Sequence, residues 1–141
     1  MTTVAFDGEV IASDSRLTSG DFICSVSTPK IYKIGDSFVG VCGCSEQEMV
    51  YLRWFKDQTK PRPSPDSLKE FEAMVVRSNG KVYQSTELCE FVEIGYPYAI
   101  GSGGDYAIGA MMAGKSATDA VKIAIKIDPF SGGKVKSFKV K

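Results

Sequence analysis

Residues 1–12 read MTTVAFDGEVIA, and this stretch decides the fold. Segments 2–5 and 10–12 are both rich in residues that favour β-strands. Asp7-Gly8 lies between them, and a two-residue type I′ turn needs the positive φ angles that these residues tolerate. The stretch therefore predicts a β-hairpin that holds the beginning of the chain inside a sheet.

The same stretch carries a candidate nucleophile, because removal of Met1 would make Thr2 the first residue. Its hydroxyl would then lie beside its own α-amine, which is one way to activate a weak hydroxyl nucleophile. That amine has an unperturbed pKa of about 7.7–8.0, close to neutral pH. No propeptide precedes Thr2 in this sequence, so we expect the loss of Met1 alone to expose it.

The composition is typical of one soluble globular domain over residues 1–141, with 43% hydrophobic and 24% charged residues. The 17 basic and 17 acidic residues cancel, so no overall field attracts nucleic acid or an anionic membrane. The sequence has no signal peptide and no apolar run of membrane length, and we therefore expect a cytoplasmic protein.

The chain contains no histidine, which excludes Ser-His-Asp and Cys-His catalysis and removes the commonest metal ligand. The spacing of Cys42 and Cys44 is wrong for a usual zinc site, and no second close pair exists. We expect the four cysteines to be buried free thiols, and we expect neither a metal nor a cofactor.

Alternating apolar residues and turn dipeptides predict a series of short strands. The predicted strands are 2–5, 10–12, 22–26, 30–34, 37–41, 71–77, 81–84, 87–94 and 135–140. Ser45-x-x-Glu48 fits a capping box for a helix over about 46–57. Two further helices are expected over 105–113 and 116–127. This order predicts an α+β fold with sheets between helical layers.

Without histidine, a lysine cation is the best candidate to lower the pKa of the Thr2 amine and hydroxyl. Lys30 follows a proline at the start of a strand, and Asp14 could hold it by charge. Gly43 could donate its N–H to an oxyanion. Taken singly, each has a plainer and stronger interpretation: a turn aspartate, a surface lysine and a glycine before a helix.

Taken together, ordered blocks of this sequence resemble the proteasome β-subunit and HslV peptidase family over nearly the whole chain. The blocks are 2–5, 12–16, 30–31, 40–43, 99–104 and 128–133. The resemblance implies a four-layer αββα sandwich, the fold of N-terminal-nucleophile hydrolases, and a threonine endopeptidase activity.

The resemblance also implies roles for the matching residues. These are Thr2 as nucleophile with its α-amine as proton acceptor, Lys30 as activator, Asp14 to orient Lys30, Gly43 in the oxyanion hole, and Ser102, Asp128 and Ser131 to hold the terminus and a water. Thr18 would pair with the backbone of an extended substrate. The first specificity pocket would be lined by Leu17, Thr28, Tyr32, Val41, Ser45 and Met49. That lining is largely apolar, so we expect cleavage after medium or large apolar residues.

The implied partners are peptides or unfolded proteins, further copies of the chain in a homo-oligomeric ring, and an ATPase unfoldase. Apolar residues such as Trp54, Met111 and Met112 would serve either subunit contacts or the core. One alternative is a catalytically inactive, self-assembling structural subunit of the same fold. Another is a nucleotide-binding module that uses the glycine-rich turn over 101–104 at a helix N-terminus. That turn lacks the lysine of a phosphate-binding loop.

Overall fold

The first hairpin forms the centre of one antiparallel sheet in the computed structural model, which describes residues 2–140. The strands of this sheet lie in the order β10-β1-β2-β11. Their bounds are β1 Val4–Phe6, β2 Val10–Ser13, β10 Tyr98–Ile100 and β11 Lys136–Lys139. The predicted hairpin is confirmed, since β1 and β2 pair on either side of the Asp7-Gly8 turn. The beginning of the chain is thus held between β2 and β10.

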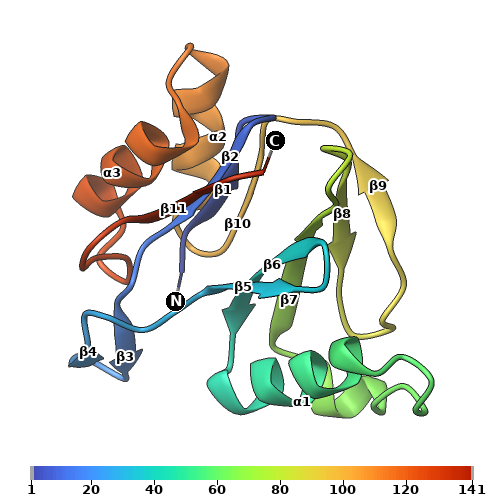
Figure 1. Cartoon of the computed structure of the whole chain (residues 1–141). Helices are drawn as coiled ribbons and strands as arrows, with labels where there is room; N and C mark the ends of the chain where they lie inside the picture. Colours follow the sequence, from blue (N-terminus) through green and yellow to red (C-terminus); the bar gives the residue numbers. More distant parts are fainter. Residues whose placement is uncertain (1, 141) are drawn as a thin grey trace.

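A second antiparallel sheet is built from the middle of the chain, in the order β5-β6-β7-β8-β9. Its strands are β5 Ile31–Ile34, β6 Ser37–Gly43, β7 Phe71–Val76, β8 Val82–Ser85 and β9 Val92–Ile94. A small separate hairpin pairs β3 (Leu17–Ser19) with β4 (Phe22–Ser25). This hairpin projects from the edge of the molecule (Figure 1).

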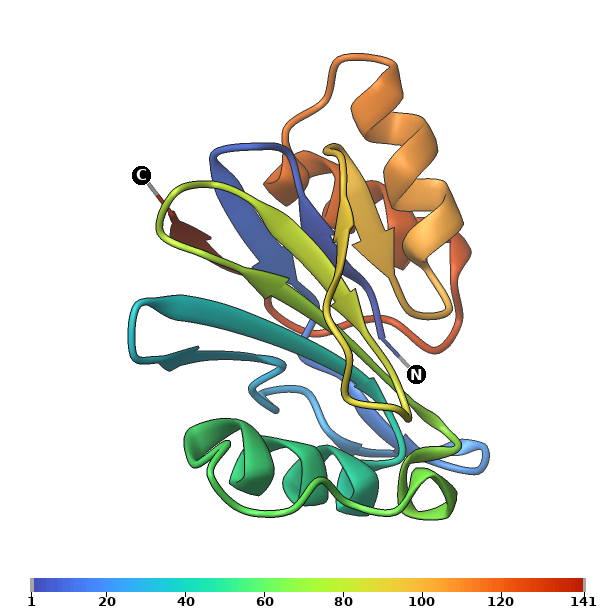
Figure 2. The ribbon, with the colours of Figure 1, turned by 90° about the vertical axis from the view of Figure 1, so that its right-hand side faces the viewer.

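Helices cover the outer face of each sheet. Helices α2 (Gly104–Met112) and α3 (Ala117–Ile127) lie on the first sheet, while α1 (Ser45–Lys56) and the 3₁₀ turn η1 (Pro65–Leu68) lie beneath the second. The view turned by 90° shows the same succession of helices, two sheets and helix (Figure 2). The predicted four-layer α+β sandwich is confirmed.

Three buried clusters correspond to the three boundaries between these layers. Aromatic residues dominate below the second sheet, where the rings of Tyr51 and Phe71 are 4.5 Å apart. Small alanines dominate between the first sheet and α2 and α3. Between the sheets, a Cβ at Gly40 would lie 2.6 Å from Val4 Cγ1, so the glycine lets the two sheets approach closely.

Several local predictions differ from the structure. The capping box is wrong, because the N-cap of α1 is Cys44 and no side chain caps the helix. The strand predicted over 87–94 is limited to Val92–Ile94. Both β3 and β10 were absent from the prediction. Ser116 caps α3 by accepting the Asp119 N–H at 3.2 Å, and the lysine-rich β11 forms a sheet edge.

The surface combines charged residues with exposed apolar side chains. Phe22 and Ile23 on the β3–β4 hairpin are 62% and 49% exposed, and Met112 on α2 is 70% exposed. Of the four thiols, Cys42 and Cys89 are buried as predicted, whereas Cys24 is exposed and Cys44 is half-buried. Among residues 2–140, no helix is long and apolar enough to cross a membrane.

Candidate active site

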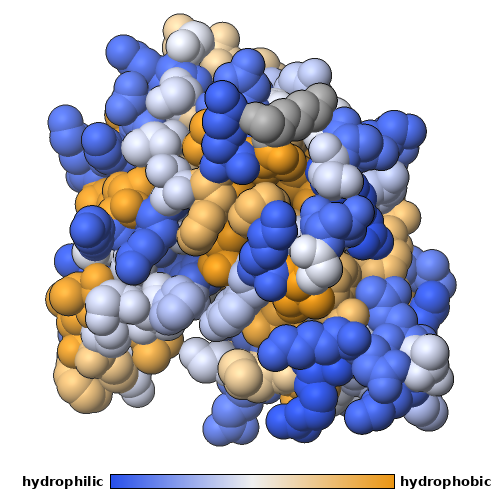
Figure 3. Space-filling view, in the orientation of Figure 1, coloured by the Kyte–Doolittle hydropathy of each residue, from blue (hydrophilic) through white to orange (hydrophobic). Residues whose placement is uncertain are grey.

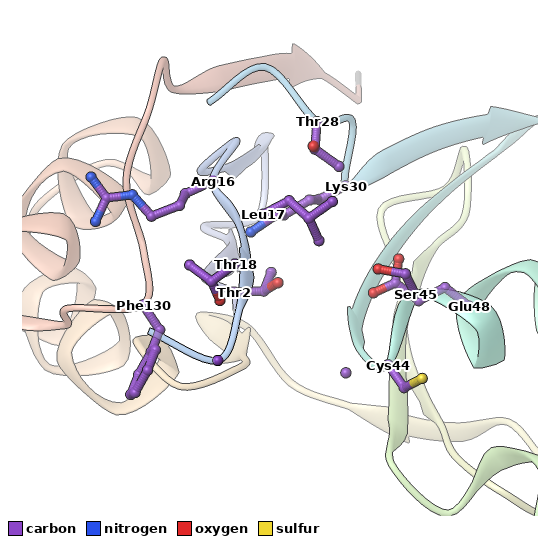
Figure 4. A pocket seen from close by; sticks show the side chains of 12 residues that line it. Thr2, Arg16, Leu17, Thr18, Thr28, Lys30, Cys44, Ser45, Glu48 and Phe130 are labelled. Carbon is purple, nitrogen blue, oxygen red and sulfur yellow. The ribbon is translucent and has the colours of Figure 1, made fainter. Parts of the chain in front are cut away.

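A cavity of about 390 Å³ lies between the β3–β4 hairpin and the start of α1. The surface is hollowed at this place (Figure 3), and Figure 4 shows the side chains that line the cavity. They are Thr2, Arg16, Leu17, Thr18, Gly20, Thr28, Lys30, Gly43, Cys44, Ser45, Glu48 and Phe130. Residues that precede β1 and β5, the end of β6, the β3–β4 hairpin and the start of α1 therefore meet around one space.

Thr2 is fixed in this cavity through its backbone. It precedes β1 and is 3% exposed, and its carbonyl accepts the N–H of Gly103 at 3.2 Å. Gly101 has φ +94°, and a Cβ there would lie 1.9 Å from the Thr2 carbonyl oxygen. The glycine-rich turn thus packs against Thr2. The Gly103 N–H is already bonded to the Thr2 carbonyl and is therefore unavailable to a phosphate.

Asp14 and Lys30 form a buried ion pair beside Thr2. Lys30 Nζ lies 3.0 Å from each carboxylate oxygen, and the two side chains are 0% and 5% exposed. Asp14 also accepts backbone N–H groups from Thr3 and Gly132, both at 3.0 Å, and from Arg16 at 3.3 Å. Burial lowers the pKa of Lys30, although the attraction of Asp14 opposes this.

Asp128 organises a second polar cluster next to the first strand. The hydroxyls of Ser102 and Ser131 each donate to Asp128 Oδ2 at 2.6 Å, and the Ser131 oxygen lies 2.7 Å from Thr3 Oγ1. Burial raises the pKa of Asp128, but these hydroxyls and the Phe130 N–H outweigh it and hold the pKa below its usual range. Through Ser131 this cluster thus contacts Thr3, the residue after Thr2, and none of its three members lines the cavity.

Gly43 ends β6 and lines the same cavity as Thr2. Its φ is +115°, and a Cβ there would lie 1.9 Å from the carbonyl oxygen of Glu70. No side chain fits at this point, so the backbone itself forms the cavity wall. Gly43 also borders a second cavity of about 700 Å³ that reaches Ser102.

The residues predicted for substrate contact divide into two groups. Leu17, Thr18, Thr28 and Ser45 line the cavity around Thr2. Tyr32, Val41 and Met49 do not: Val41 belongs to the cluster beneath α1, Tyr32 packs against that cluster, and Met49 is 53% exposed. The lining is consequently less apolar than the sequence predicted.

Two charged residues of the lining were missed as site residues. The Arg16 guanidinium points away from the cavity (Figure 4) and donates to the carbonyl of Pro129 at 3.1 Å. Glu48, in the first turns of α1, faces Thr2 and Lys30 across the cavity (Figure 4). Burial raises the pKa of Glu48 to about 7, while the nearby Lys30 opposes the shift. The sequence placed Glu48 in an expected capping box, which predicts a side chain bonded to the helix N-terminus instead of one directed into the cavity.

Comparisons with known proteins agree with this geometry. The chain is 29% identical over 178 aligned positions to the proteasome subunit beta type-5 of Gallus gallus, covering 99% of this chain and 70% of that protein. No protein-family model matches the chain.

Solved structures give the same fold at lower sequence identity. BPH of Thiobacillus denitrificans aligns with a TM-score of 0.77 and 22% identity, over 99% of this chain and 97% of that one. Its complex with epoxomicin gives a TM-score of 0.78 with the same identity and coverage. HslV from Trypanosoma brucei aligns with a TM-score of 0.75 and 19% identity, over 98% of this chain and 97% of that one. The shared fold and the sequence relationship confirm the resemblance to the proteasome β-subunit and HslV family that the sequence predicted.

Proposed function

We propose that this chain is a threonine peptidase whose nucleophile is Thr2 after Met1 has been removed. The observation that carries the proposal is the buried Lys30 amine, which is held by both oxygens of Asp14 and lines the same cavity as Thr2. A fixed cation at this point lowers the pKa of both the Thr2 hydroxyl and its α-amine. A backbone wall without a side chain, at Gly43, adjoins the same space.

The proposed reaction is acyl transfer in two steps. Thr2 Oγ attacks the peptide carbonyl carbon while the α-amine takes the hydroxyl proton, and the Gly43 N–H stabilises the oxyanion. The C–N bond then breaks, the amine product leaves with that proton, and an ester to Thr2 remains. Water adds to the ester with the α-amine as base, which releases the carboxylic acid and restores the hydroxyl.

Assembly into a homo-oligomeric ring is part of the proposal. Large exposed apolar side chains on the β3–β4 hairpin, Phe22 and Ile23, support it, because such residues commonly mark contacts between proteins. Analytical ultracentrifugation of the purified chain should give a mass of several copies. A monomer at all concentrations would count against the ring.

The nucleophile is tested by intact mass spectrometry. The native protein should lack Met1, and incubation with epoxomicin, which binds the Thiobacillus denitrificans relative, should add the mass of one inhibitor per chain. Thr2→Ala should gain no mass, and Thr2→Ser should retain the reaction because the hydroxyl remains. A native protein that keeps Met1 and hydrolyses no peptide would instead support the inactive structural subunit.

A further inference from the structure

Glu48 lies in the first turn of α1 and presents to the cavity a carboxylate that makes no capping hydrogen bond to its helix. The N-cap of α1 is Cys44, which has no side-chain cap, and the backbone N–H of Glu48 donates to the Cys44 carbonyl at 3.0 Å. Its side chain is half-buried and accepts no hydrogen bond from any residue within 2–140. A carboxylate without a hydrogen-bond donor in such a place is costly unless something else satisfies it.

The cations near the cavity attract this carboxylate, but those within residues 2–140 direct their hydrogen bonds to other acceptors. Lys30 Nζ lies 3.0 Å from both oxygens of Asp14, and it attracts Glu48 through charge. The Arg16 guanidinium is turned towards the Pro129 carbonyl instead of the cavity. A cationic group that enters from solvent would therefore meet a carboxylate that still lacks a hydrogen-bond donor.

The position of Glu48 relative to Thr2 makes this charge relevant to substrate choice. A peptide carbonyl within reach of Thr2 and Gly43 carries its own residue's side chain one atom away, so that side chain must enter the adjoining cavity. Leu17 and Thr28 offer the walls along which an aliphatic stem can lie, and Glu48 stands across the cavity from Thr2 (Figure 4). Lysine and arginine combine such a stem with a terminal cation.

We propose that Glu48 is a specificity-determining residue that selects lysine or arginine on the acyl side of the scissile bond. The inference rests on the proposed peptidase function, and it replaces the apolar preference expected from the sequence. A substrate leucine before the scissile bond would cover the Glu48 carboxylate without giving it a hydrogen-bond donor. The guanidinium or ammonium group of a substrate arginine or lysine supplies a charge-assisted hydrogen bond instead. An acidic side chain would be repelled.

The first test compares fluorogenic peptides that differ only in the residue before the bond: arginine, leucine or glutamate. Wild-type chain should show a kcat/KM for arginine on the order of 10–100-fold above leucine, as a hydrogen bond to a charged group provides. Glu48→Gln should reduce this ratio to near one, and Glu48→Lys should reverse the order towards glutamate. Glu46→Gln, an exposed residue on the same helix outside the cavity, is the matched control and should keep the wild-type ratio.

A binding measurement separates this inference from the proposed chemistry. Labelled peptides that end in arginine or leucine are titrated onto Thr2→Ala protein, with and without Glu48→Gln, and followed by fluorescence anisotropy. Preferential binding of arginine that depends on Glu48 supports the inference even if the wild type hydrolyses nothing, in which case the peptidase proposal alone fails. Equal binding of both peptides, or a preference for arginine that survives Glu48→Gln, overturns the inference whether or not hydrolysis occurs. Thermal melts of each variant confirm that it is folded.

Discussion

The Lys30 ammonium lies 3.0 Å from both carboxylate oxygens of Asp14, and both side chains are buried. This pair joins the start of the second sheet to the end of β2. Because Asp14 also accepts three backbone N–H groups, its loss would leave four donors without their acceptor. We expect Lys30, which we propose as the activator of Thr2, to contribute less to the stability of the fold than Asp14.

Asp14→Ala should therefore destabilise the chain more than Lys30→Met. Removing one partner of a buried ion pair costs about 3–5 kcal/mol, and Asp14→Ala should reach this range because it also orphans the backbone donors. Lys30→Met keeps the three backbone bonds to Asp14 and an unbranched side chain of similar length. Urea unfolding of both variants gives the comparison. An equal or larger loss for Lys30→Met would mean that the backbone bonds of Asp14 contribute little.

Gly101→Ala should displace the candidate nucleophile. The new Cβ would lie 1.9 Å from the Thr2 carbonyl oxygen at a backbone φ of +94°, so the turn or the terminus must move. We expect a loss of about 1–3 kcal/mol from backbone strain alone, with loss of epoxomicin addition.

Gly109→Ala is the matched control for this substitution. Gly109 lies within α2 and has nothing within 4 Å of an added Cβ. Alanine there should stabilise the chain by about 0.5–1 kcal/mol, since glycine is unfavourable inside a helix. If Gly101→Ala matched the control in both melting temperature and inhibitor addition, the position of Thr2 would not depend on a glycine at residue 101.

Asp128 should make stability depend on acid pH. Its pKa is lower in the folded chain than in the unfolded chain, so the unfolded state binds a proton first as pH falls. The contribution is therefore fully present above the unfolded pKa of about 3.9 and is lost as pH falls through the folded value. Asp128→Asn should flatten this part of the curve, and Ser102→Ala should flatten it less. Denaturant midpoints measured from pH 6 to pH 2 test this; an unchanged slope in Asp128→Asn would contradict it.

The preference for basic residues should itself depend on pH. Glu48 has a pKa of about 7, so its carboxylate is charged above this pH and neutral below it. The ratio of kcat/KM for arginine over leucine substrates should rise through pH 7 in the wild type. Using the ratio cancels the titration of the Thr2 amine, which affects both substrates alike. Glu48→Gln should give a flat ratio, and a rise that persists in this variant would assign the titration to another group.

The parts of the fold that could be predicted were those with strong local signals. Asp7-Gly8 and Gly35-Asp36 mark hairpins because their turns need unusual φ angles, and the structure forms both. Strands β3 and β10 have only three residues each, flanked by polar or turn residues, so their pairing with distant partners defines them rather than their own pattern.

The lining of the cavity was predicted where strand ends decide position and was missed where side-chain direction decides it. Thr2, Lys30 and Gly43 line one cavity because strand ends bring them there. Val41 was expected in the pocket, but alternation along β6 turns Val39 and Val41 towards α1 and leaves Phe38 and Cys42 on the other face. Glu48 was not expected in the pocket, because the sequence predicted that its side chain caps α1, but it lines the cavity.

The hydrogen bonds around the first strand join residues far apart in the sequence. Gly132 lies 118 residues beyond Asp14, and Ser131 lies 128 residues beyond Thr3. During translation, residues 2–14 leave the ribosome long before residues 128–132 exist. A growing chain therefore displays its threonine without the surroundings that would activate it. Under the proposed function, proteolytic capacity appears only when synthesis has supplied the last partners, and unfinished copies leave neighbouring nascent proteins intact.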